Sequence, residues 1–186
     1  CMIQLDTSWL QHVQKPARYT GGEYNSIVKD HSTVDVTMAL GFPDVYEVAM
    51  SHLGIKILYG LVNRREDAVA ERVFAPWHDM EEEMRKRNIP LFSLETRTPI
   101  KDFDVLAFTL QYEMSFTNIL NMLDLAGIPM YAKERDLDFP LLVCGGPCAY
   151  NVEPIADFFD IVSLGESEEW GDEFIEDRKS TRLNSS

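Results

Sequence analysis

Five short apolar runs alternate with amphipathic segments along this chain, and that alternation limits its possible folds more than any other feature. The runs are VDVTMALG (34–41), AERVFAP (70–76), DVLAFTL (104–110), PLLVCGG (140–146) and DIVSLGE (160–166). Glycine, proline or polar residues close each run, as expected of strands that are buried on both faces. We therefore predict an α/β fold: a flavodoxin-like (Rossmann-like), doubly wound sheet of five parallel strands in the order 2-1-3-4-5, with helices on both faces.

The segments between the runs show the periodicity of helices. Residues 51–63 carry apolar side chains at steps of three and four, which predicts one buried stripe: Leu53, Ile57, Leu58, Leu61 and Val62. Further on, Ser115 stands where an N-cap is expected, and Gly127 followed by Pro129 predicts the end of a helix. In residues 77–88, three glutamates precede three basic residues by four positions, which is typical of a solvated helix face.

Charge and hydropathy exclude several classes of protein. The formal net charge of −14 argues against direct nucleic-acid binding, which usually depends on a basic surface. No run reaches the ~18 apolar residues that a membrane helix needs, and no charged-then-apolar leader begins the chain. We therefore expect a cytoplasmic protein without a membrane partner. The chain has three cysteines, an odd number, which does not suggest a disulfide framework.

The two ends of the chain differ in character from its centre. The chain begins at Cys1 rather than methionine, and residues 177–186 (DRKSTRLNSS) turn abruptly from acidic to basic and serine-rich. We expect an N-terminal extension over 1–32, one α/β domain over 33–176 and a non-native tail over 177–186. The whole chain is expected to be the N-terminal part of a longer protein.

Four loops should meet at one edge of the predicted sheet, where ligands of open α/β sheets usually bind. They follow the first, third, fourth and fifth runs and read GFPDVYEVAMSHLG, QYEMS, GGPCAYN and GESEE. In the third of these loops, Gly145 and Gly146 suit close approach of the backbone to a large flat or anionic ligand, or simply a tight turn. The phosphate-binding motifs Gly-x-Gly-x-x-Gly and Walker A are absent from the sequence.

Polar residues in the first of these loops allow two interpretations. Asp44, Tyr46 and Glu47 form either an acid–base group or ordinary caps and turn residues. His52 stands at an expected helix start, where it either contacts a ligand or packs as a capping residue. The sequence alone leaves both pairs of alternatives open.

Two cysteines, Cys144 and Cys148, flank the double glycine. A zinc site usually needs two ligand pairs, and no second cysteine or histidine pair follows in the sequence. A three-cysteine iron–sulfur motif of the type Cys-x-x-x-Cys-x-x-Cys would need its third cysteine where Asn151 stands. We therefore assign no metal ligand, and we expect Cys144 in a buried strand and Cys148 in the turn.

Five stretches of the sequence resemble one known family. They are KPARYTGGEYNSIVKD, FPDVYEVAMSHLGIKILY, ERVFAPW, FTLQYEMSFTNILNMLDLAGIP and GGPCAYNVEPIADFFD. Together they are similar to the N-terminal part of a largely uncharacterised family of cobalamin-binding-domain radical SAM proteins, over residues from about 15 to 169. The resemblance implies a flavodoxin-like, corrinoid-binding fold for this chain. It also implies a downstream radical SAM barrel that carries a three-cysteine cluster motif.

The resemblance further implies where a corrinoid would be held. Corrinoid domains that supply a histidine ligand to cobalt carry Asp-x-His-x-x-Gly after the first strand, whereas residues 44–49 read DVYEVA here. The Ser-x-Leu signature after the third strand is matched loosely by residues 109–111 (TLQ), and the double glycine after the fourth strand is present. The residues implied to bind the cofactor are Gly41, Pro43, Ser51, His52, Leu53, Gly54, Thr109, Gln111, Tyr112, Gly145, Gly146, Pro147, Gly165 and Glu166. No catalytic residue is assigned.

Three functions are consistent with this pattern. The first is a corrinoid (cobalamin)-binding domain that positions its cofactor for the barrel of the same protein. The 4Fe-4S cluster and S-adenosylmethionine would then belong to that barrel, and this chain alone is not expected to be catalytic. The second is a docking module that contacts the barrel or an RNA-modifying partner without a corrinoid, and the third is a flavin or nucleotide binder. Arg18, Tyr19 and Glu23, in the N-terminal extension, are expected to pack on the barrel.

Overall fold

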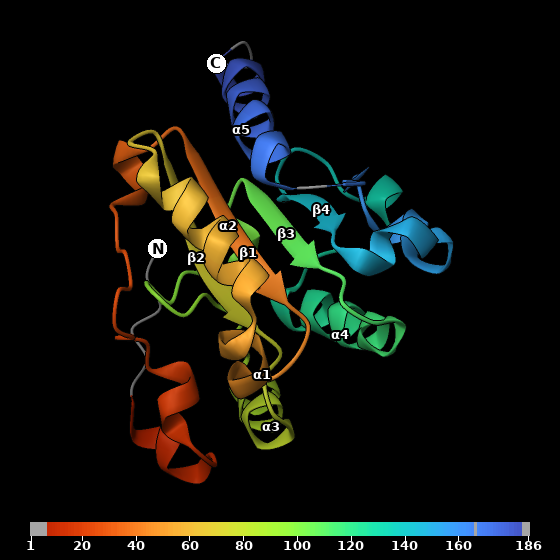
Figure 1. Cartoon of the computed structure of the whole chain (residues 1–186). Coiled ribbons are helices and arrows are strands. Elements are labelled where there is room, and N and C mark those ends of the chain that lie inside the picture. Colours follow the sequence, from red (N-terminus) through yellow and green to blue (C-terminus); the bar gives the residue numbers. More distant parts are fainter. Residues whose placement is uncertain (1–6, 166, 184–186) are drawn as a thin grey trace.

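Five parallel strands form one sheet in the order β2-β1-β3-β4-β5 (Figure 1), which confirms the predicted flavodoxin-like topology. The computed structural model describes residues 7–165 and 167–183. The strands are β1 (Val36–Phe42), β2 (Ala68–Phe74), β3 (Val105–Thr109), β4 (Leu141–Gly145) and β5 (Ile161–Val162). Every residue of β1 and β2 is buried, as continuous apolar runs predict for strands that are covered on both faces.

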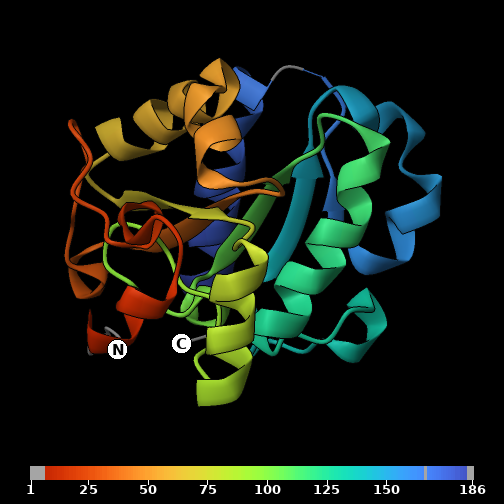
Figure 2. The same cartoon turned by 90° about the horizontal axis from the view of Figure 1, so that it is seen from below.

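Helices cover both faces of this sheet. They are α1 (Tyr46–Ser51), α2 (Leu53–Arg64), α3 (His78–Arg87), α4 (Phe116–Ala126) and α5 (Ser167–Leu183). Figure 2 shows α2 on one side of the sheet and α3 and α4 on the other. Helix α5 lies on the side of α2, because Phe174 and Ile175 share a core with Ile55 and Tyr59. Short 3₁₀ helices occupy connections at Thr7–His12, Pro16–Tyr19, His31–Thr33, Ile100–Asp102, Glu113–Ser115, Ala132–Glu134, Pro147–Asn151 and Glu153–Phe158.

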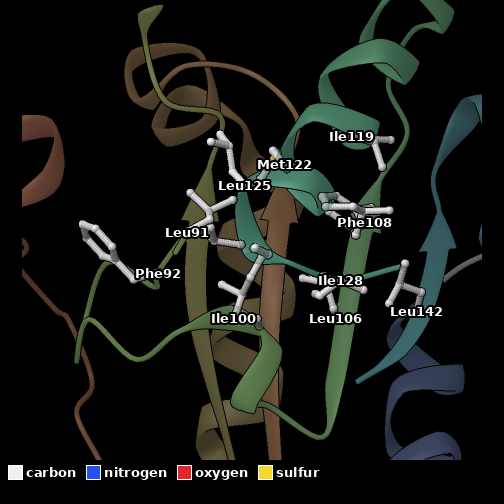
Figure 3. Packing of buried hydrophobic residues seen from close by; sticks show 14 of the residues in the cluster. Leu91, Phe92, Ile100, Leu106, Phe108, Ile119, Met122, Leu125, Ile128 and Leu142 are labelled. Carbon is white, nitrogen blue, oxygen red and sulfur yellow. The ribbon is translucent and has the colours of Figure 1, made fainter. Parts of the chain in front are cut away.

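The larger hydrophobic core lies between the sheet and helices α3 and α4. In Figure 3, Leu106 of β3 and Leu142 of β4 lie in one cluster with Ile119 and Met122 of α4. All four side chains are buried. Full burial of an aliphatic side chain of this size contributes about 1.5–3 kcal/mol. This packing therefore holds α4 firmly against the sheet.

Gly41 has a packing function on the α3/α4 face of the sheet. It pairs with Phe108 of the neighbouring strand β3. A Cβ atom at Gly41 would lie 2.6 Å from two carbon atoms of the Phe108 ring. Glycine is therefore needed in β1 so that this ring can lie across the strand.

Two sequence-based predictions on this side of the molecule are partly wrong. The fifth strand was expected over 160–166 but contains only Ile161–Val162, and Gly165 further on turns the chain with φ +113°, which an extended strand does not adopt. Leu53 and Ile57, which belong to the stripe predicted in α2, are exposed. Ile55 and Tyr59, which that stripe left out, are buried. The side of α2 that packs on the core therefore carries Ile55, Tyr59 and Val62.

For helices α3 and α4, two predictions are confirmed and one is wrong. Gly127 ends α4 in the left-handed conformation (φ 68°), as predicted. Ser115 precedes α4, but its hydroxyl donates to the carbonyl oxygen of Tyr112 at 2.7 Å instead of capping the helix. The i,i+4 ion pairs of α3 form as predicted, with Arg85 Nε 3.0 Å from Glu81 Oε1.

The N-terminal extension packs on this domain, and its predicted contact with a barrel stays a prediction. Arg18 Nη2 lies 2.8 Å from Glu47 Oε1 of α1. The Tyr19 hydroxyl accepts a hydrogen bond from the backbone N–H of Trp77 at 3.1 Å. Nearby residues of the extension complete the larger core: Trp9, Leu10 and Val13. The extension is therefore an integral part of the fold.

Helix α5 continues through residues 177–183, where the sequence suggested a non-native tail. Lys179 Nζ lies 3.0 Å from carboxylate oxygens of both Asp35 and Asp67. The division of the chain into extension, domain and tail stays a prediction. Among the described helices, none combines the length and the apolar character that a membrane span requires.

A buried carboxylate network fixes strand β2. Glu71 has no exposed surface, and its Oε1 atom lies 2.7 Å from His31 Nε2. Its Oε2 atom accepts hydrogen bonds from the hydroxyls of Ser93 at 2.5 Å and Thr96 at 2.7 Å. These contacts tie β2 to the extension and to the segment that precedes β3.

The outer edge of β2 is covered by that same segment. The backbone N–H of Leu94 donates to the carbonyl oxygen of Arg72 at 2.7 Å. The backbone N–H of Arg72 in turn donates to Glu95 Oε2 at 2.7 Å. Backbone groups at this edge, which would otherwise be open, are thus already bonded within the chain.

Candidate functional site

A cavity of about 390 Å³ lies on the α2/α5 face of the sheet. Its walls come from strands β1, β3 and β4, from helices α2 and α5, and from the loops that follow the strands. The lining residues are Met38, Leu40, His52, Gly54, Ile57, Leu58, Val62, Ala107, Phe108, Thr109, Gln111, Val143, Cys144, Gly145, Gly146, Ser163 and Gly171. Elements far apart in the sequence therefore enclose one space at the ends of the central strands.

The chemistry of this wall is typical of a small-molecule site. Most lining side chains are apolar, and the polar side chains among them come from His52, Thr109, Gln111 and Ser163. Ligand sites commonly combine a predominantly apolar wall with a few polar groups, in volumes of about 300–1,000 Å³. The cavity lies near the lower end of that range. It can enclose a small molecule, or one part of a larger one.

Six of the residues implied by the resemblance line the cavity. They come from the start of α2, from the last residues of β3 and β4, and from the loops that follow these two strands: His52, Gly54, Thr109, Gln111, Gly145 and Gly146. The structure thus brings together three of the loops that were expected to share one edge. Whether these residues bind a cofactor stays a prediction.

The other implied residues do not line the cavity. Gly41 lies on the opposite face of the sheet, beneath the Phe108 ring. Leu53 is exposed to solvent, and the Ser51 hydroxyl donates to the carbonyl oxygen of Val48 at 2.7 Å. These residues have local structural contacts instead.

The remaining implied residues lie in the loops after β1, β3, β4 and β5. The carbonyl oxygen of Pro43 accepts a hydrogen bond from Asn118 Nδ2 at 3.0 Å. The Tyr112 hydroxyl donates to a carboxylate oxygen of Asp44, which links the loops after β1 and β3. Pro147 begins a 3₁₀ helix, and Gly165 forms a turn after β5. Glu166 lies outside the described residues.

The double glycine serves both as a turn and as cavity wall. Gly146 has φ +105°, and a Cβ atom there would lie 2.8 Å from the carbonyl oxygen of Leu110. The carbonyl oxygen of Gly145 accepts a hydrogen bond from the Leu110 N–H at 2.7 Å. The conformation and packing at the end of β3 are sufficient reasons for glycine at position 146. Both glycines nevertheless present backbone to the cavity.

His52 carries an unsatisfied polar atom at the cavity wall. Its Nδ1 atom is buried and has no hydrogen-bond partner among the described residues. The imidazole ring packs against Phe42, with 5.1 Å between ring centroids. A Cβ atom at Gly54 would lie 2.9 Å from this ring, so Gly54 makes room for it. Buried polar atoms usually have a partner, so His52 is the side chain of this wall that most plainly lacks one.

Tyr46, which stands where the corrinoid domains of the resemblance carry their histidine ligand, does not line the cavity. Its hydroxyl donates to Glu23 Oε1 at 2.9 Å, and its ring packs edge-on against Phe74. Burial and the Glu23 carboxylate together raise the pKa of Tyr46 to about 12. The residue therefore holds the N-terminal extension against α1.

The acidic residues near Tyr46 also have structural partners. Glu47 Oε1 lies 3.0 Å from Lys15 Nζ, and hydrogen bonds from Arg18 and Lys15 lower the pKa of this carboxyl to about 2. Asp44 Oδ1 accepts a hydrogen bond from the Val45 N–H at 2.7 Å. Of the two interpretations of this loop, the structure favours caps and turns over an acid–base group.

The cysteines flanking the double glycine have different environments. Cys144 is fully buried in β4, as predicted, and burial raises the pKa of its thiol to about 12. Cys148 is half-buried in the 3₁₀ helix that follows. Within residues 7–165 and 167–183, no group of three or more histidine, cysteine, aspartate or glutamate side chains is placed to hold a metal ion.

Several cavity residues were not found from the sequence. Met38, Leu40, Ala107 and Val143 face the cavity from the strands. Met38 and Leu40 are two positions apart and so share one face of β1, and this alternation could have identified them. Gly171 of α5 carried no such signal, because the helix reaches the cavity only through the fold.

The fold and the cavity define this chain as a doubly wound α/β domain with a small-molecule-sized site at the ends of its strands. The model of the family described as "Radical SAM proteins, N-terminal" matches residues 54–185. The chain belongs to this family, which agrees with the radical SAM part of the resemblance.

The chain is also similar to an uncharacterized protein, MJ0966, of Methanocaldococcus jannaschii. The two are 27% identical over 134 residues, which cover 70% of this chain and 24% of the relative. The chain therefore spans about a quarter of the length of that relative. No solved structure matches this chain.

Proposed function

We propose that this domain binds a corrinoid, cobalamin, and positions it for a radical SAM barrel in another part of the same protein. The observation that carries the proposal is the apolar cavity beside the double glycine at the end of β4. It occurs in a sheet of flavodoxin-like order, in a chain that belongs to the family of radical SAM N-terminal domains. The 4Fe-4S cluster and S-adenosylmethionine would bind in the barrel.

The size of the cavity restricts how a corrinoid would sit. At about 390 Å³ it is near the lower limit for drug-sized ligands, and a corrinoid macrocycle with its substituents is larger than such ligands. The macrocycle would therefore lie over the mouth, while a narrower part of the molecule enters. When bound, the corrinoid supplies a cobalt centre that can carry a methyl group or take part in radical chemistry.

Two exposed apolar side chains that follow cavity residues closely in the sequence support this arrangement. Met114 is 85% exposed and Tyr150 is 76% exposed. Met114 is three residues from Gln111 and Tyr150 is four residues from Gly146, both of which line the cavity. Large apolar surfaces exposed together often mark binding sites. They would cover one face of the macrocycle and exclude water from it.

The structure favours binding without a protein ligand to cobalt at the usual position. Tyr46, which replaces the histidine there, is bonded to Glu23 and does not line the cavity. Affinity would come from burial of apolar area and from hydrogen bonds to backbone and to polar wall residues such as His52.

The proposal is tested by titrating the purified chain with hydroxocobalamin and following its visible absorption. We expect saturable uptake of one corrinoid per chain. Replacing Ala107 of β3, which lines the cavity, with leucine should weaken binding at least ~10-fold by filling the cavity, a change of about 1.4 kcal/mol. The matched control is Ala17→Leu, at an exposed position outside the cavity. Absence of corrinoid uptake by the folded wild-type chain would refute the proposal, as would a chain that retains flavin on purification.

The second candidate function is docking without a corrinoid. The exposed Met114 and Tyr150 side chains favour it, because they also suit contact with another protein surface. In a full-length protein that binds no corrinoid, Met114→Ser with Tyr150→Ser should then release this domain from the barrel, as judged by faster limited proteolysis between them. Unchanged proteolysis would exclude these residues from such an interface.

A further inference from the structure

Gly171 is an interior residue of α5 and lines the cavity. Glycine in the interior of a helix is less favourable than alanine, because it has more conformational freedom to lose on folding. Such a glycine usually has a packing or functional reason. Contacts among the described residues supply no such reason for Gly171.

Helical periodicity shows which way a side chain at position 171 would point. Phe174 and Ile175, three and four residues further along, are buried in the core on the α2/α5 face. Residues at these spacings share one side of a helix. A side chain at position 171 would therefore project toward the sheet, on the side where the cavity lies.

Among the described residues, none has an atom in the space directly beside Gly171 on this side of the helix. A Cβ atom at Gly171 would have no neighbour within 4 Å outside its own helix backbone. Two other glycines of the wall differ in this respect, since a Cβ atom would lie 2.9 Å from the His52 ring at Gly54 and 2.8 Å from the Leu110 oxygen at Gly146. Packing within the protein accounts for glycine at those two positions but not at position 171.

We propose that Gly171 is a ligand-facing position whose missing side chain determines how large a group the cavity admits. The group is predominantly apolar, as the walls are, and it lies against the backbone of α5 at Gly171. The identity of the whole ligand as a corrinoid rests on the function proposed above. The assignment of Gly171 itself rests on the cavity, the helix face and the open space.

The chain offers a matched control for this position. Gly60 is an interior glycine of α2, a Cβ atom there would also have no neighbour within 4 Å, and it does not line the cavity. Alanine at either position should raise the midpoint of thermal unfolding, because both replace a helix glycine. Only position 171 should affect ligand binding.

The test compares Gly171→Ala and Gly171→Leu with Gly60→Ala and Gly60→Leu in two binding assays. The first is titration with hydroxocobalamin. The second is fluorescence titration with 1-anilinonaphthalene-8-sulfonate, an apolar dye that reports the open cavity without any corrinoid. For Gly171→Leu we expect at least a ~10-fold loss of affinity in both assays, and for Gly171→Ala a smaller loss despite higher stability. The Gly60 variants should stay within about twofold of the wild type.

The outcomes separate this inference from the proposed function. If hydroxocobalamin binds the wild type and Gly171→Leu equally well, the assignment of Gly171 is wrong while the proposed function stands. If the wild type binds only the dye and Gly171→Leu loses it, the corrinoid proposal fails and the assignment of Gly171 stands. If Gly171→Leu does not unfold cooperatively, Gly171→Ala decides, because equal binding by this more stable variant overturns the assignment.

Discussion

Replacing Glu71 with alanine is expected to remove a large part of the stability of this domain. The side chain is fully buried in β2 and accepts hydrogen bonds from three other side chains. Alanine would remove the acceptor of the fully buried Ser93 hydroxyl and of the partly buried His31 and Thr96 donors, of which Thr96 keeps a contact with Thr98. Leaving a buried donor without its acceptor costs about 1–3 kcal/mol, and because three donors lose this acceptor we expect a total of about 3–5 kcal/mol. That is a large share of the roughly 5–15 kcal/mol that stabilises a typical domain.

Replacing Glu71 with glutamine removes the negative charge and keeps the shape of the side chain. It keeps the volume of Glu71 and one acceptor oxygen, so its cost should be about 1.5–3 kcal/mol, the value of a hydrogen bond to a charged group. Urea unfolding followed by circular dichroism measures both variants. The control is Glu82→Ala, whose side chain is 73% exposed and lies 3.9 Å from Lys86, and it should change stability by less than about 0.5 kcal/mol. A Glu71→Ala variant within about 1 kcal/mol of the wild type would refute this reasoning.

The same network predicts a pH dependence. Burial alone would raise the pKa of Glu71, but hydrogen bonds from His31, Ser93 and Thr96 outweigh it, and the pKa is lowered. A lowered pKa in the folded state adds stability above the ordinary glutamate value of about 4.3, and this stability is lost as the pH falls through the folded-state pKa. The stability difference between wild type and Glu71→Gln should therefore shrink on acidification. A difference that grows below pH ~4 would contradict the sign of this argument.

Three further predictions concern the core. Gly41→Ala should cost about 1–3 kcal/mol in urea unfolding, because the new methyl group would overlap the Phe108 ring; an unchanged midpoint would show that the ring can move. Trp9→Ala should cost about 3–5 kcal/mol if the extension belongs to the core, and a neutral result would count against that assignment. In a Cys1→Ser background, a thiol reagent should modify Cys148 in the native protein and reach Cys144 only on unfolding, because Cys144 is buried with a pKa of about 12. Equal rates for both thiols would contradict this.

The sheet order could be predicted from the sequence because its physical cause is local. Each buried strand appears as a continuous apolar run, and each crossover appears as a helical period, so the chain order leaves few possible topologies. The meeting of His52, Thr109 and Gly146 at one cavity followed from the same rule, since carboxyl ends of parallel strands lie together.

The details that the sequence did not reveal depend on contacts between distant residues. Gly41 looked like a site residue, but its reason is the Phe108 ring on the neighbouring strand. Ile57 was predicted to be part of a buried stripe, but it lines the cavity that α2 encloses with the strands and α5. The position of Gly171 at the cavity depends on how α5 packs on the α2 face of the sheet. Periodicity describes one element at a time and carries no information on such contacts.

The way this sheet ends on either side restricts how the domain can associate with other proteins. At the β2 edge of the sheet, the backbone N–H and carbonyl groups of Arg72 are already hydrogen-bonded within the chain. At the other edge, β5 has only two residues, Ile161–Val162. Strand addition, in which a foreign peptide extends a sheet, needs a longer row of vacant amides and carbonyls. Recruitment of this domain must therefore depend on side-chain surfaces, and the architecture itself protects the chain against fibrous self-assembly through its margins.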